Sequence, residues 1–190
     1  DLRTSRGLGD VYKRQDVSQV LRGDGQEIIN LRLTNSGHWR EPAQLERIDP
    51  QLIKMLIAYE DKRFWQHHGV DPLAVMRAAI SLAKSGKIKS GASTLTMQTV
   101  KLMHPELRKR SFKNKLYQMA EAIRLEAHWS KEEILEAYFT LAPYGGNIEG
   151  IEAATEAWFQ KSPSQLTFTE AALLVALPQS PERRRPDLFP

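Results

Sequence analysis

Hydrophobic and polar positions divide the chain into one alternating segment and a long run of helical segments. Residues 17–33 alternate apolar and polar side chains around Gly23-Asp24-Gly25, a pattern typical of a β-hairpin. From Asp49 onward, apolar residues recur three or four positions apart, which is the spacing of one helix face. The expected helices begin at Asp49, Asp71, Ser93, Ser111 and Ser130, and two further helices follow Gly150. The pattern therefore predicts a mainly α-helical fold with a small N-terminal β-hairpin.

Several of the expected helices have a start signal and an apolar face. Asp49-Pro50 and Asp71-Pro72 place a capping side chain before a proline, and Ser130 with Glu133 has the spacing of a capping box. The apolar faces are Leu52, Ile53, Leu56 and Ile57 in the first helix, Leu73, Met76 and Ile80 in the second, and Phe112, Leu116, Met119 and Ile123 in the helix expected from Ser111 to His128. The longest unbroken apolar run, Ala171 to Leu177, is far too short to span a membrane.

Shifts in composition divide the chain into four segments. Residues 1–15 lack periodicity and a start methionine, so we interpret them as disordered or foreign sequence. Residues 16–48 comprise the hairpin and a linker, and residues 49–180 form the helical domain. Residues 181–190 are rich in proline and arginine, which indicates a linker towards a further domain.

The bulk composition is that of one globular domain with a locally cationic region. The chain has 190 residues, of which 41% are hydrophobic and 26% charged, and its formal net charge is +4. Nine lysine and arginine residues but only one acid, Glu106, lie between Lys84 and Lys115. Such an excess attracts an anionic partner: a diphosphate, a nucleic acid or an anionic membrane surface. The absence of cysteine excludes disulfides and thiolate zinc sites.

Glu60 is the first candidate catalytic residue. It lies four positions after Leu56 and three after Ile57, so it continues the buried face of the first helix. A carboxylate there either lies at a cleft, where it suits a general base, or forms an internal salt bridge. Spacing alone favours the salt bridge.

Three further features each allow a structural and a functional interpretation. His67 and His68 are adjacent and point in different directions, and without a third ligand at metal spacing structural roles are favoured over a metal site. Ser93 and Thr94 begin a helix after a basic loop, which fits an anion site, although serine and threonine are also the usual helix caps. The basic cluster Arg108 to Lys115 fits either a solvated helix face or a diphosphate cradle.

Five segments resemble, in order and spacing, the signatures of the peptidoglycan glycosyltransferases (glycosyltransferase family 51). They are EDKRFWQHHGVD at 60–71, GASTLTMQTVK at 91–101, RSFKNKLYQMAEAIRLE at 110–126, ILEAYFTLAPYG at 134–145 and GIEAATEAWFQK at 150–161. The resemblance extends from Val17 to the end of the chain. The phrases APYGGNIEG and LPQSPERRRPD are similar to the 1C-like subtype of the class A penicillin-binding proteins.

The resemblance implies a lysozyme-like helical transglycosylase fold and an enzyme that polymerises lipid II into glycan strands. Glu60 matches the catalytic base, which would deprotonate the 4-hydroxyl of a lipid II sugar. That oxygen would attack the anomeric carbon of the lipid-linked strand and displace undecaprenyl diphosphate with inversion. By the same resemblance the substrate-binding positions are Asp61, Arg63, Phe64, Ser93, Thr94, Gln98, Lys101, Arg110 and Gln118, with Lys101 and Arg110 at the phosphates.

Two residues depart from the family pattern. Gln118 stands where the third signature usually has a second glutamate, and a glutamine can hydrogen-bond but cannot carry charge. Thr140 stands where the fourth signature usually has asparagine, which we expect to weaken at most a structural hydrogen bond. Neither change touches the proposed base.

The resemblance also implies where the domain works and with what. Its partners would be lipid II, a lipid-linked glycan strand, the membrane surface and a C-terminal transpeptidase domain in the full protein, at the periplasmic face of the cytoplasmic (inner) membrane. The helix from Asp71 to Ser85 is expected to meet lipid. No nucleic-acid partner, metal site or required cofactor is expected, although a divalent cation (Mg²⁺ or Mn²⁺) could assist.

Three alternatives remain open on sequence alone. A lysozyme-like enzyme that cleaves glycan would need a protonated acid and no cationic cradle, so the basic stretch favours synthesis. A basic helical module that binds nucleic acid or membrane lacks a base-reading motif. A catalytically degenerate homologue kept for scaffolding gains some support from Gln118 and Thr140.

Overall fold

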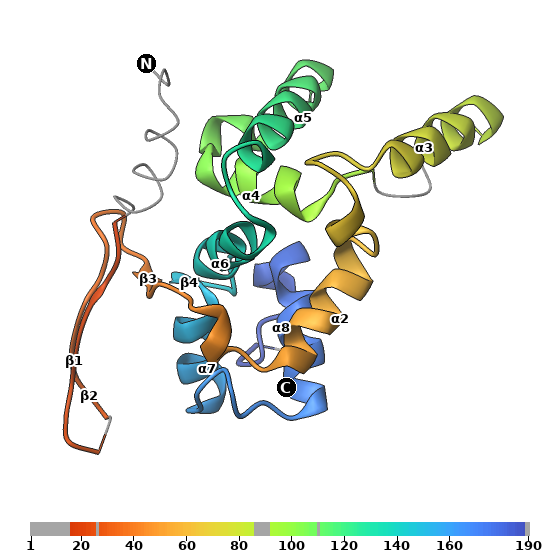
Figure 1. The fold of residues 1–190 in the computed structure, drawn as a ribbon. Helices are drawn as coiled ribbons and strands as arrows, with labels where there is room; N and C mark the ends of the chain where they lie inside the picture. The colour runs from red at the N-terminus through yellow and green to blue at the C-terminus, as the bar shows by residue number, and fades with distance from the viewer. Residues whose placement is uncertain (1–15, 26, 86–91, 110, 189–190) are drawn as a thin grey trace. The chain divides into compact units, whose positions relative to one another are not determined.

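The computed structural model describes residues 16–188 apart from Gln26, residues 86–91 and Arg110. The interpretation of residues 1–15, the loop residues Lys87 and Lys89, and the role of Arg110 therefore lie outside the described residues. The described part is mainly helical (Figure 1). Its helices are α2 (Pro50–Glu60), α3 (Pro72–Ser85), α4 (Leu95–Met103), α5 (Phe112–Glu126), α6 (Lys131–Leu141), α7 (Ile151–Phe159) and α8 (Phe168–Ala176). Its strands are β1 (Gln19–Arg22), β2 (Ile28–Arg32), β3 (Trp39–Arg40) and β4 (Ile148–Glu149).

The helix starts follow the local signals in the sequence. The Asp49 carboxylate accepts a hydrogen bond from the backbone N–H of Gln51 at 2.7 Å, just before α2. Ser130 and Glu133 form the expected reciprocal capping box at the start of α6. Thr167 and Glu170 form a second capping box at the start of α8. The predicted starts at Asp49 and Ser130 are confirmed, because each depends on neighbours within one turn.

The chain divides into two compact units. The first contains Leu56–Leu135, and the second contains the described residues before Leu56 and after Leu135. In the first unit α4 packs along α5 (Figure 1). Leu95, Met97 and Val100 of α4 are buried, so this short helix lies at the centre of the first unit's core.

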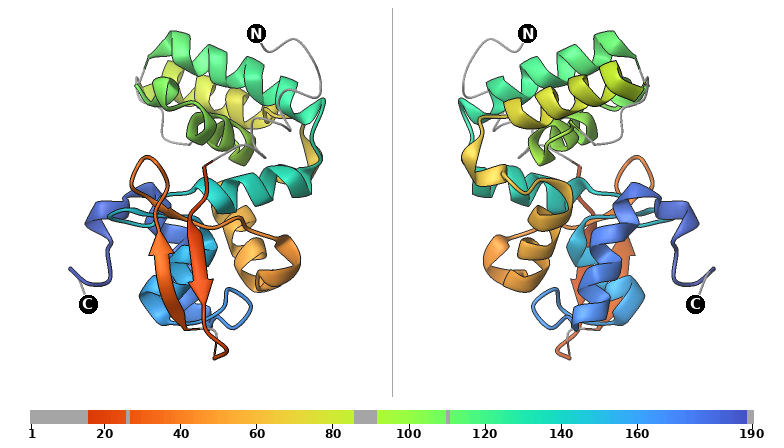
Figure 2. Two further views of the ribbon diagram at one scale, coloured as in Figure 1. Left: turned by 90° about the vertical axis from the view of Figure 1, so that its left-hand side faces the viewer. Right: turned by 90° about the vertical axis from the view of Figure 1, so that its right-hand side faces the viewer.

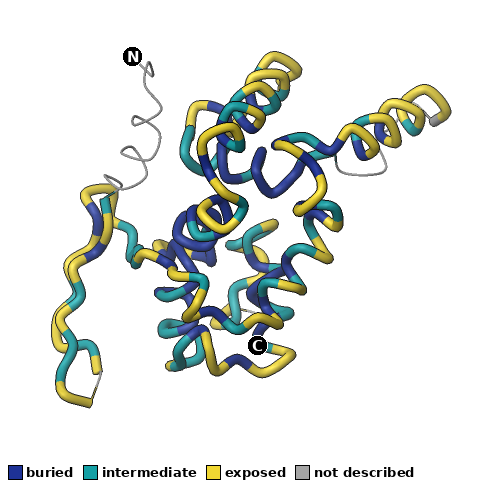
Figure 3. Tube along the Cα trace, viewed as in Figure 1, coloured by how far each residue is buried: buried dark blue, intermediate teal, exposed yellow. Residues whose placement is uncertain are grey.

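The large apolar residues of α3 and α5 face solvent, which corrects the predicted α5 face. Phe112, Leu116 and Ile123 are exposed, and the buried residues of α5 are instead Gln118, Ala122 and Leu125. These three follow one another at helical spacing and include the small alanine, which lets the helix approach its neighbours closely. In α3, likewise, Ala74 and Ala78 are buried while Leu73, Met76 and Ile80 are exposed. Figure 3 shows α4 buried or intermediate along its length, α3 largely exposed, and α5 as a mixture of exposed, intermediate and buried residues.

The second unit contains the predicted hairpin. β1 and β2 pair antiparallel, with Gln19 opposite Arg32 and a register irregularity after Leu21. β3 and β4 form a separate parallel pair that joins Trp39 to Ile148. Buried side chains of this unit include Leu52, Phe139, Tyr144, Ile151 and Leu174.

Thr140 and the C-terminal segment also belong to the second unit. Thr140 is buried, and its hydroxyl accepts a hydrogen bond from the backbone N–H of Ala43 at 2.9 Å, so the threonine still supplies a structural acceptor. The segment predicted to be a linker folds back on Gly146, whose backbone N–H donates to Glu182 at 2.8 Å. A transpeptidase domain beyond it stays a prediction.

Gly69 provides a test of the close packing in the first unit. Its φ is +82°, and a Cβ there would lie 2.5 Å from the carbonyl carbon and oxygen of Ala122 in α5. Gly37 has a φ of +81°, but a Cβ at that position would have nothing within 4 Å. We expect Gly37→Ala to cost about 1 kcal/mol from backbone strain. Gly69→Ala should cost roughly 2 kcal/mol more, because the α5 backbone must also move.

Denaturant unfolding of both variants measures the difference directly. Since the two glycines have nearly the same φ, their comparison isolates the steric contact with α5. Equal losses in the two variants would contradict the close approach of Gly69 to Ala122.

Candidate active site

Glu60 is the last residue of α2 and lies at a pocket. Leu56, one turn earlier, is buried, and Glu60 is half-buried at the edge of the same face. Its Oε2 accepts a hydrogen bond of 2.9 Å from Nε2 of Gln98 in α4. The structure therefore brings together two predicted site residues that are 38 positions apart in the sequence.

The pocket beside Glu60 has a volume of about 520 Å³ and a mixed charge. Its lining includes Glu60, Arg63, Asp71, Arg77 and Ser93. Arg63 donates from Nη1 to the Asp71 carboxylate at 3.2 Å, and Arg77 approaches the other Asp71 oxygen at 3.8 Å. Arg63 is thus at the pocket, as predicted, and Arg77 is a lining cation that sequence reasoning missed. The signal for Arg77 was weak because it lies on an exposed helix outside the signature segments.

Asp61 is buried and holds two other elements in place. Its Oδ2 accepts a hydrogen bond from the backbone N–H of Leu95, the first residue of α4, at 2.9 Å. The Nε2 of His67 lies 3.0 and 2.9 Å from the two carboxylate oxygens and donates to them. His67 is therefore structural, as expected. Asp61, predicted to bind substrate, uses its carboxylate within the protein and positions its neighbour Glu60.

The side chain of Phe64, which was predicted to bind substrate, is fully buried, and that role stays a prediction. Lys131 Nζ lies 4.4 Å from the centre of its ring. The same ammonium donates to the carbonyl of His67 at 2.8 Å and to Glu126 at 2.7 Å. Glu126 also accepts from the hydroxyl of Thr96. Phe64 thus belongs to a cluster that packs the first-signature loop against α4, α5 and the start of α6.

Thr94 serves as a helix cap rather than as an open anion ligand. Its hydroxyl oxygen accepts from the backbone N–H of Met97 at 3.2 Å and its hydroxyl donates to the carbonyl of Gly69. The side chain is buried. Ser93, one residue earlier, is more exposed and accepts a hydrogen bond from Nζ of Lys115. Of this pair, Ser93 is the one that remains available to a ligand.

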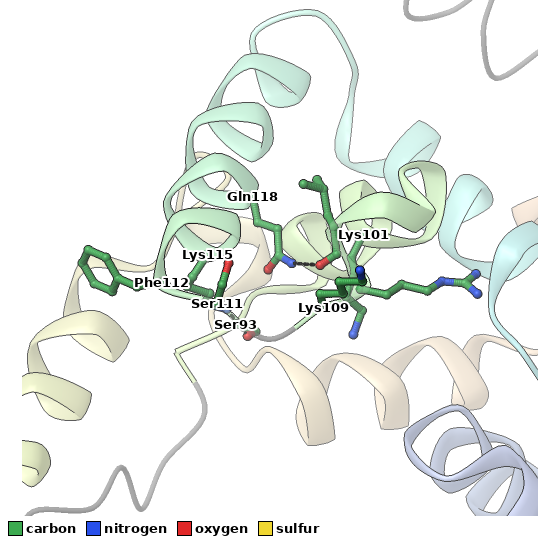
Figure 4. A pocket seen from close by; sticks show the side chains of 9 residues that line it. Ser93, Lys101, Lys109, Ser111, Phe112, Lys115 and Gln118 are labelled. Carbon is green, nitrogen blue, oxygen red and sulfur yellow. Dashed lines mark hydrogen bonds between the residues drawn. The ribbon is translucent and has the colours of Figure 1, made fainter.

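A second pocket, of about 560 Å³, is cationic. Figure 4 shows Lys101, Lys109, Lys115 and Gln118 around it, and Ser93 lines both this pocket and the Glu60 pocket. Among the described residues its lining has four cations, the fourth being Arg108, and no carboxylate. Such a pocket can hold a doubly charged anion beside the pocket that contains Glu60. Sequence reasoning named Lys101 here, but recognised Lys109 and Lys115 only as part of a basic run.

Lys115 is electrostatically strained in this pocket. Burial lowers the pKa of its ammonium group below the ordinary value, and the nearby charge of Lys101 lowers it further. Both effects penalise the charged form of Lys115. A bound anion would therefore stabilise this ammonium group more than it would stabilise the ammonium group of an exposed lysine. The pocket is therefore prepared for an anion.

Gln118 lines the cationic pocket but its amide is engaged. It is buried, and its Nε2 donates to the carbonyl of Leu107 at 3.0 Å. An ionised glutamate could not donate this hydrogen bond. The glutamine at position 118 thus lacks the charge of the usual glutamate, but its hydrogen bond to Leu107 fixes the turn before α5.

The described residues contain no group of three or more His, Cys, Asp or Glu side chains arranged to hold a metal ion. Of the predicted site residues, those that line the Glu60 pocket are Glu60, Asp61, Arg63, Ser93 and Thr94. Gln98 is hydrogen-bonded to Glu60, and Lys101 and Gln118 line the other pocket. The side chains of Asp61, Phe64 and Thr94 are buried, and Arg110 is outside the described residues.

Comparison with known proteins identifies the family of this chain. A profile of the transglycosylase family matches residues 24–189. Together with relatives more than 30% identical over most of the chain, this match shows that the chain belongs to the transglycosylase family. The predicted mainly α-helical, lysozyme-like fold class is confirmed with it.

Within that family the chain is similar to class A penicillin-binding proteins. Penicillin-binding protein 1C of Escherichia coli (strain K12) is 47% identical over 154 residues, which cover 81% of this chain and 20% of that protein. Penicillin-binding protein 1A of the same organism is 39% identical over 186 residues, covering 94% and 21%. Penicillin-binding protein 1A of Aquifex aeolicus (strain VF5) is 36% identical over 146 residues, covering 77% and 20%. The chain spans about a fifth of the length of these relatives.

The positioning role of Asp61 is testable by stability. Asp61→Ala leaves the N–H of Leu95 and the buried ring of His67 without their acceptor, so we expect a loss of about 3 kcal/mol in the free energy of unfolding. Asp61→Asn keeps one acceptor oxygen and should lose less. Denaturant unfolding measures both, with Glu132→Gln on the exposed face of α6 as a neutral control. An Asp61→Ala variant as stable as the control would rule out this role.

Proposed function

We propose that this domain is a peptidoglycan glycosyltransferase that polymerises lipid II into glycan strands. One observation carries the proposal: the pocket that contains the Glu60 carboxylate meets a pocket lined by four cations at a shared residue, Ser93. A base beside an anion-binding pocket suits a transfer reaction whose leaving group is a diphosphate. Membership of the transglycosylase family supports the same reaction class.

In the proposed reaction Glu60 accepts the proton of the 4-hydroxyl on the incoming lipid II sugar. The freed oxygen forms a bond to the anomeric carbon of the lipid-linked strand, and the bond from that carbon to the diphosphate breaks. The electron pair leaves with undecaprenyl diphosphate, and attack from the opposite side inverts the anomeric centre. Gln98 orients the base through its hydrogen bond to Oε2. Lys101, Lys109 and Lys115 stabilise the charge that develops on the leaving group.

The proposed reaction needs no cofactor. A divalent cation, Mg²⁺ or Mn²⁺, would assist only by screening the diphosphate charge that the lysines already face. Nucleic acid is not a proposed partner.

A glycan-cleaving enzyme is the alternative from the same fold class. Cleavage requires a protonated acid that assists a sugar alcohol to depart, and a pocket of four cations contributes nothing to that step. Incubation with lipid II and, separately, with polymeric glycan distinguishes the two functions, because one lengthens chains and the other shortens them.

Replacing the base provides the direct test. Glu60→Gln keeps an oxygen that can accept the Gln98 hydrogen bond but cannot take up a proton, so we expect the rate of lipid II polymerisation to fall about 100-fold or more. Glu132→Gln makes the same chemical change on an exposed helix face and should leave the rate unchanged.

The outcomes separate the mechanism from its rivals. Equal activity of Glu60→Gln and the unaltered chain would contradict the role of Glu60. If both were inactive with lipid II while binding it, the scaffolding interpretation would replace the enzymatic one.

We further propose that the domain works on the periplasmic face of the cytoplasmic membrane, next to a C-terminal transpeptidase domain of the full protein. No helix within the described ranges is both long enough and apolar enough to cross a bilayer. The exposed apolar residues of α3, namely Leu73, Met76, Ile80 and Leu82, instead suit contact with a membrane surface. Surface contact would bring the cationic pocket to a lipid-linked diphosphate.

The membrane contact is testable with anionic vesicles. Replacing Leu73, Met76 and Ile80 together by serine should weaken vesicle binding roughly tenfold or more, because the apolar area that enters the interface is lost. Replacing Leu21 and Ile29, which are exposed in the hairpin, by serine provides a control for the general loss of exposed apolar surface. Co-sedimentation with phosphatidylglycerol vesicles measures both. If the triple variant binds vesicles as tightly as the unaltered chain, α3 is not the part of the domain that contacts the membrane.

A further inference from the structure

A third pocket lies in the second unit and belongs to no part of the proposed transferase site. Its volume is about 370 Å³, and it is lined by the β1–β2 hairpin, by Arg47 and by α7 with the residues that follow it. Figure 2 shows the hairpin running beside α7, and Arg22 of β1 lies 3.8 Å from Glu156 of α7. This volume lies at the lower end of the range for small-molecule pockets.

Glu152 is the unusual residue of this pocket. Its side chain is only 10% exposed, and its Oε1 is buried without a hydrogen-bond partner among the described residues. The other oxygen, Oε2, lies 3.8 Å from Nη2 of Arg47, a distance too long for a hydrogen bond. The Arg47 side chain is 60% exposed. A buried carboxylate normally has its oxygens satisfied, because leaving one unpaired is costly. The pocket thus presents an acceptor that the protein itself does not use.

Two of the cations at this pocket are shared with carboxylates outside it. Among the described residues, three cations (Arg22, Arg47 and Lys161) and three carboxylates (Glu27, Glu152 and Glu156) line the pocket. Arg22 is shared between Glu41 and Glu156, and Lys161 lies 2.7 Å from Glu170, so each of these two cations also pairs with a carboxylate outside the lining.

The electrostatics of Glu152 agree with this geometry. Burial raises the pKa of the Glu152 carboxyl, and Glu41 raises it further, while Arg47 and Arg22 lower it. The existing cations therefore do not offset the cost of burying the Glu152 carboxylate. A further positive group next to this carboxylate would offset that cost.

We infer that this pocket binds a primary ammonium group, with the buried Oε1 of Glu152 as its principal acceptor. An alkylammonium can donate three hydrogen bonds, so after a small rotation of the Glu152 side chain it would satisfy the buried Oε1 while its other hydrogens face Glu156. The ammonium comes from a small diamine or from a lysine side chain of a peptide, since both offer the same head group. This site is independent of glycosyl transfer and does not rest on the function proposed above.

Binding to the full 190-residue chain tests the inference. The probes are 1,5-diaminopentane and Nα-acetyl-lysine amide, with the same lysine derivative acetylated at Nε as the neutral control. Titrations of the ¹⁵N-labelled chain at constant ionic strength should show saturable shifts of the backbone signals of Glu152 and Glu156 with the cations and none with the neutral control. Binding of both probes means that the ammonium alone is recognised, and binding of the lysine derivative alone points to a peptide.

Two variants with opposite expected effects keep the test independent of folding. Glu152→Gln preserves shape but removes the charge, so the cation affinity should fall tenfold or more. Arg47→Ala removes the exposed competitor for Glu152, so the affinity should rise severalfold. Glu46→Gln, an exposed acid beside Arg47 that does not line the pocket, should change nothing.

Three results would overturn the inference. They are the absence of saturable binding of either probe up to about 10 mM, equal affinity of the unaltered chain and Glu152→Gln, and a weakened affinity in Arg47→Ala. Thermal unfolding of each variant accompanies the titration, because a misfolded variant also loses affinity.

Discussion

The buried carboxylate of Asp61 is the interaction on which the geometry of the candidate active site depends. It accepts the N–H of Leu95 at the start of α4 and a hydrogen bond from His67, and it directly follows Glu60 in the chain. The first N–H groups of a helix have no partner within the helix, so a fixed acceptor there sets the position of the whole helix. Through this contact the end of α2 and the start of α4 are held at one place. Gln98, one turn into α4, then reaches Glu60.

Local signals predicted most of the fold, and distant contacts decided most of the site. The capping residues Asp49 and Ser130 act within one turn, so sequence alone located the helices that they begin. The α5 face was predicted wrongly because periodicity counts apolar residues without knowing which neighbour the helix meets. A face with Ala122 at its centre packs closely, whereas the larger side chains on the other face stay in solvent. Hydrophobic periodicity therefore identified α5 but not the face that it buries.

The signature residues illustrate the same limit at the level of single side chains. Glu60 and Ser93 lie at pockets, but Phe64, in the same signature segment as Glu60, is buried and serves packing. Thr94, beside Ser93, lines the Glu60 pocket but is buried and caps α4. A signature groups residues that act on a ligand with residues that hold them, and sequence alone does not separate the two. The net charge of the chain is similarly uninformative about single sites, because it averages a cationic pocket at Lys101 with a pocket at Glu152 whose described lining has equal numbers of cations and carboxylates.

Lys115 links occupancy of the cationic pocket to protons. Burial and the charge of Lys101 keep the pKa of this lysine low, and an anion in the pocket opposes both causes. As the anion enters, the lysine holds its proton more tightly, and as the anion departs the proton is released more readily. Occupancy is therefore accompanied by proton uptake at alkaline pH, and its heat should vary with the ionisation enthalpy of the buffer. The heat measured in a calorimeter would then report, through Lys115, whether an anion occupies the pocket.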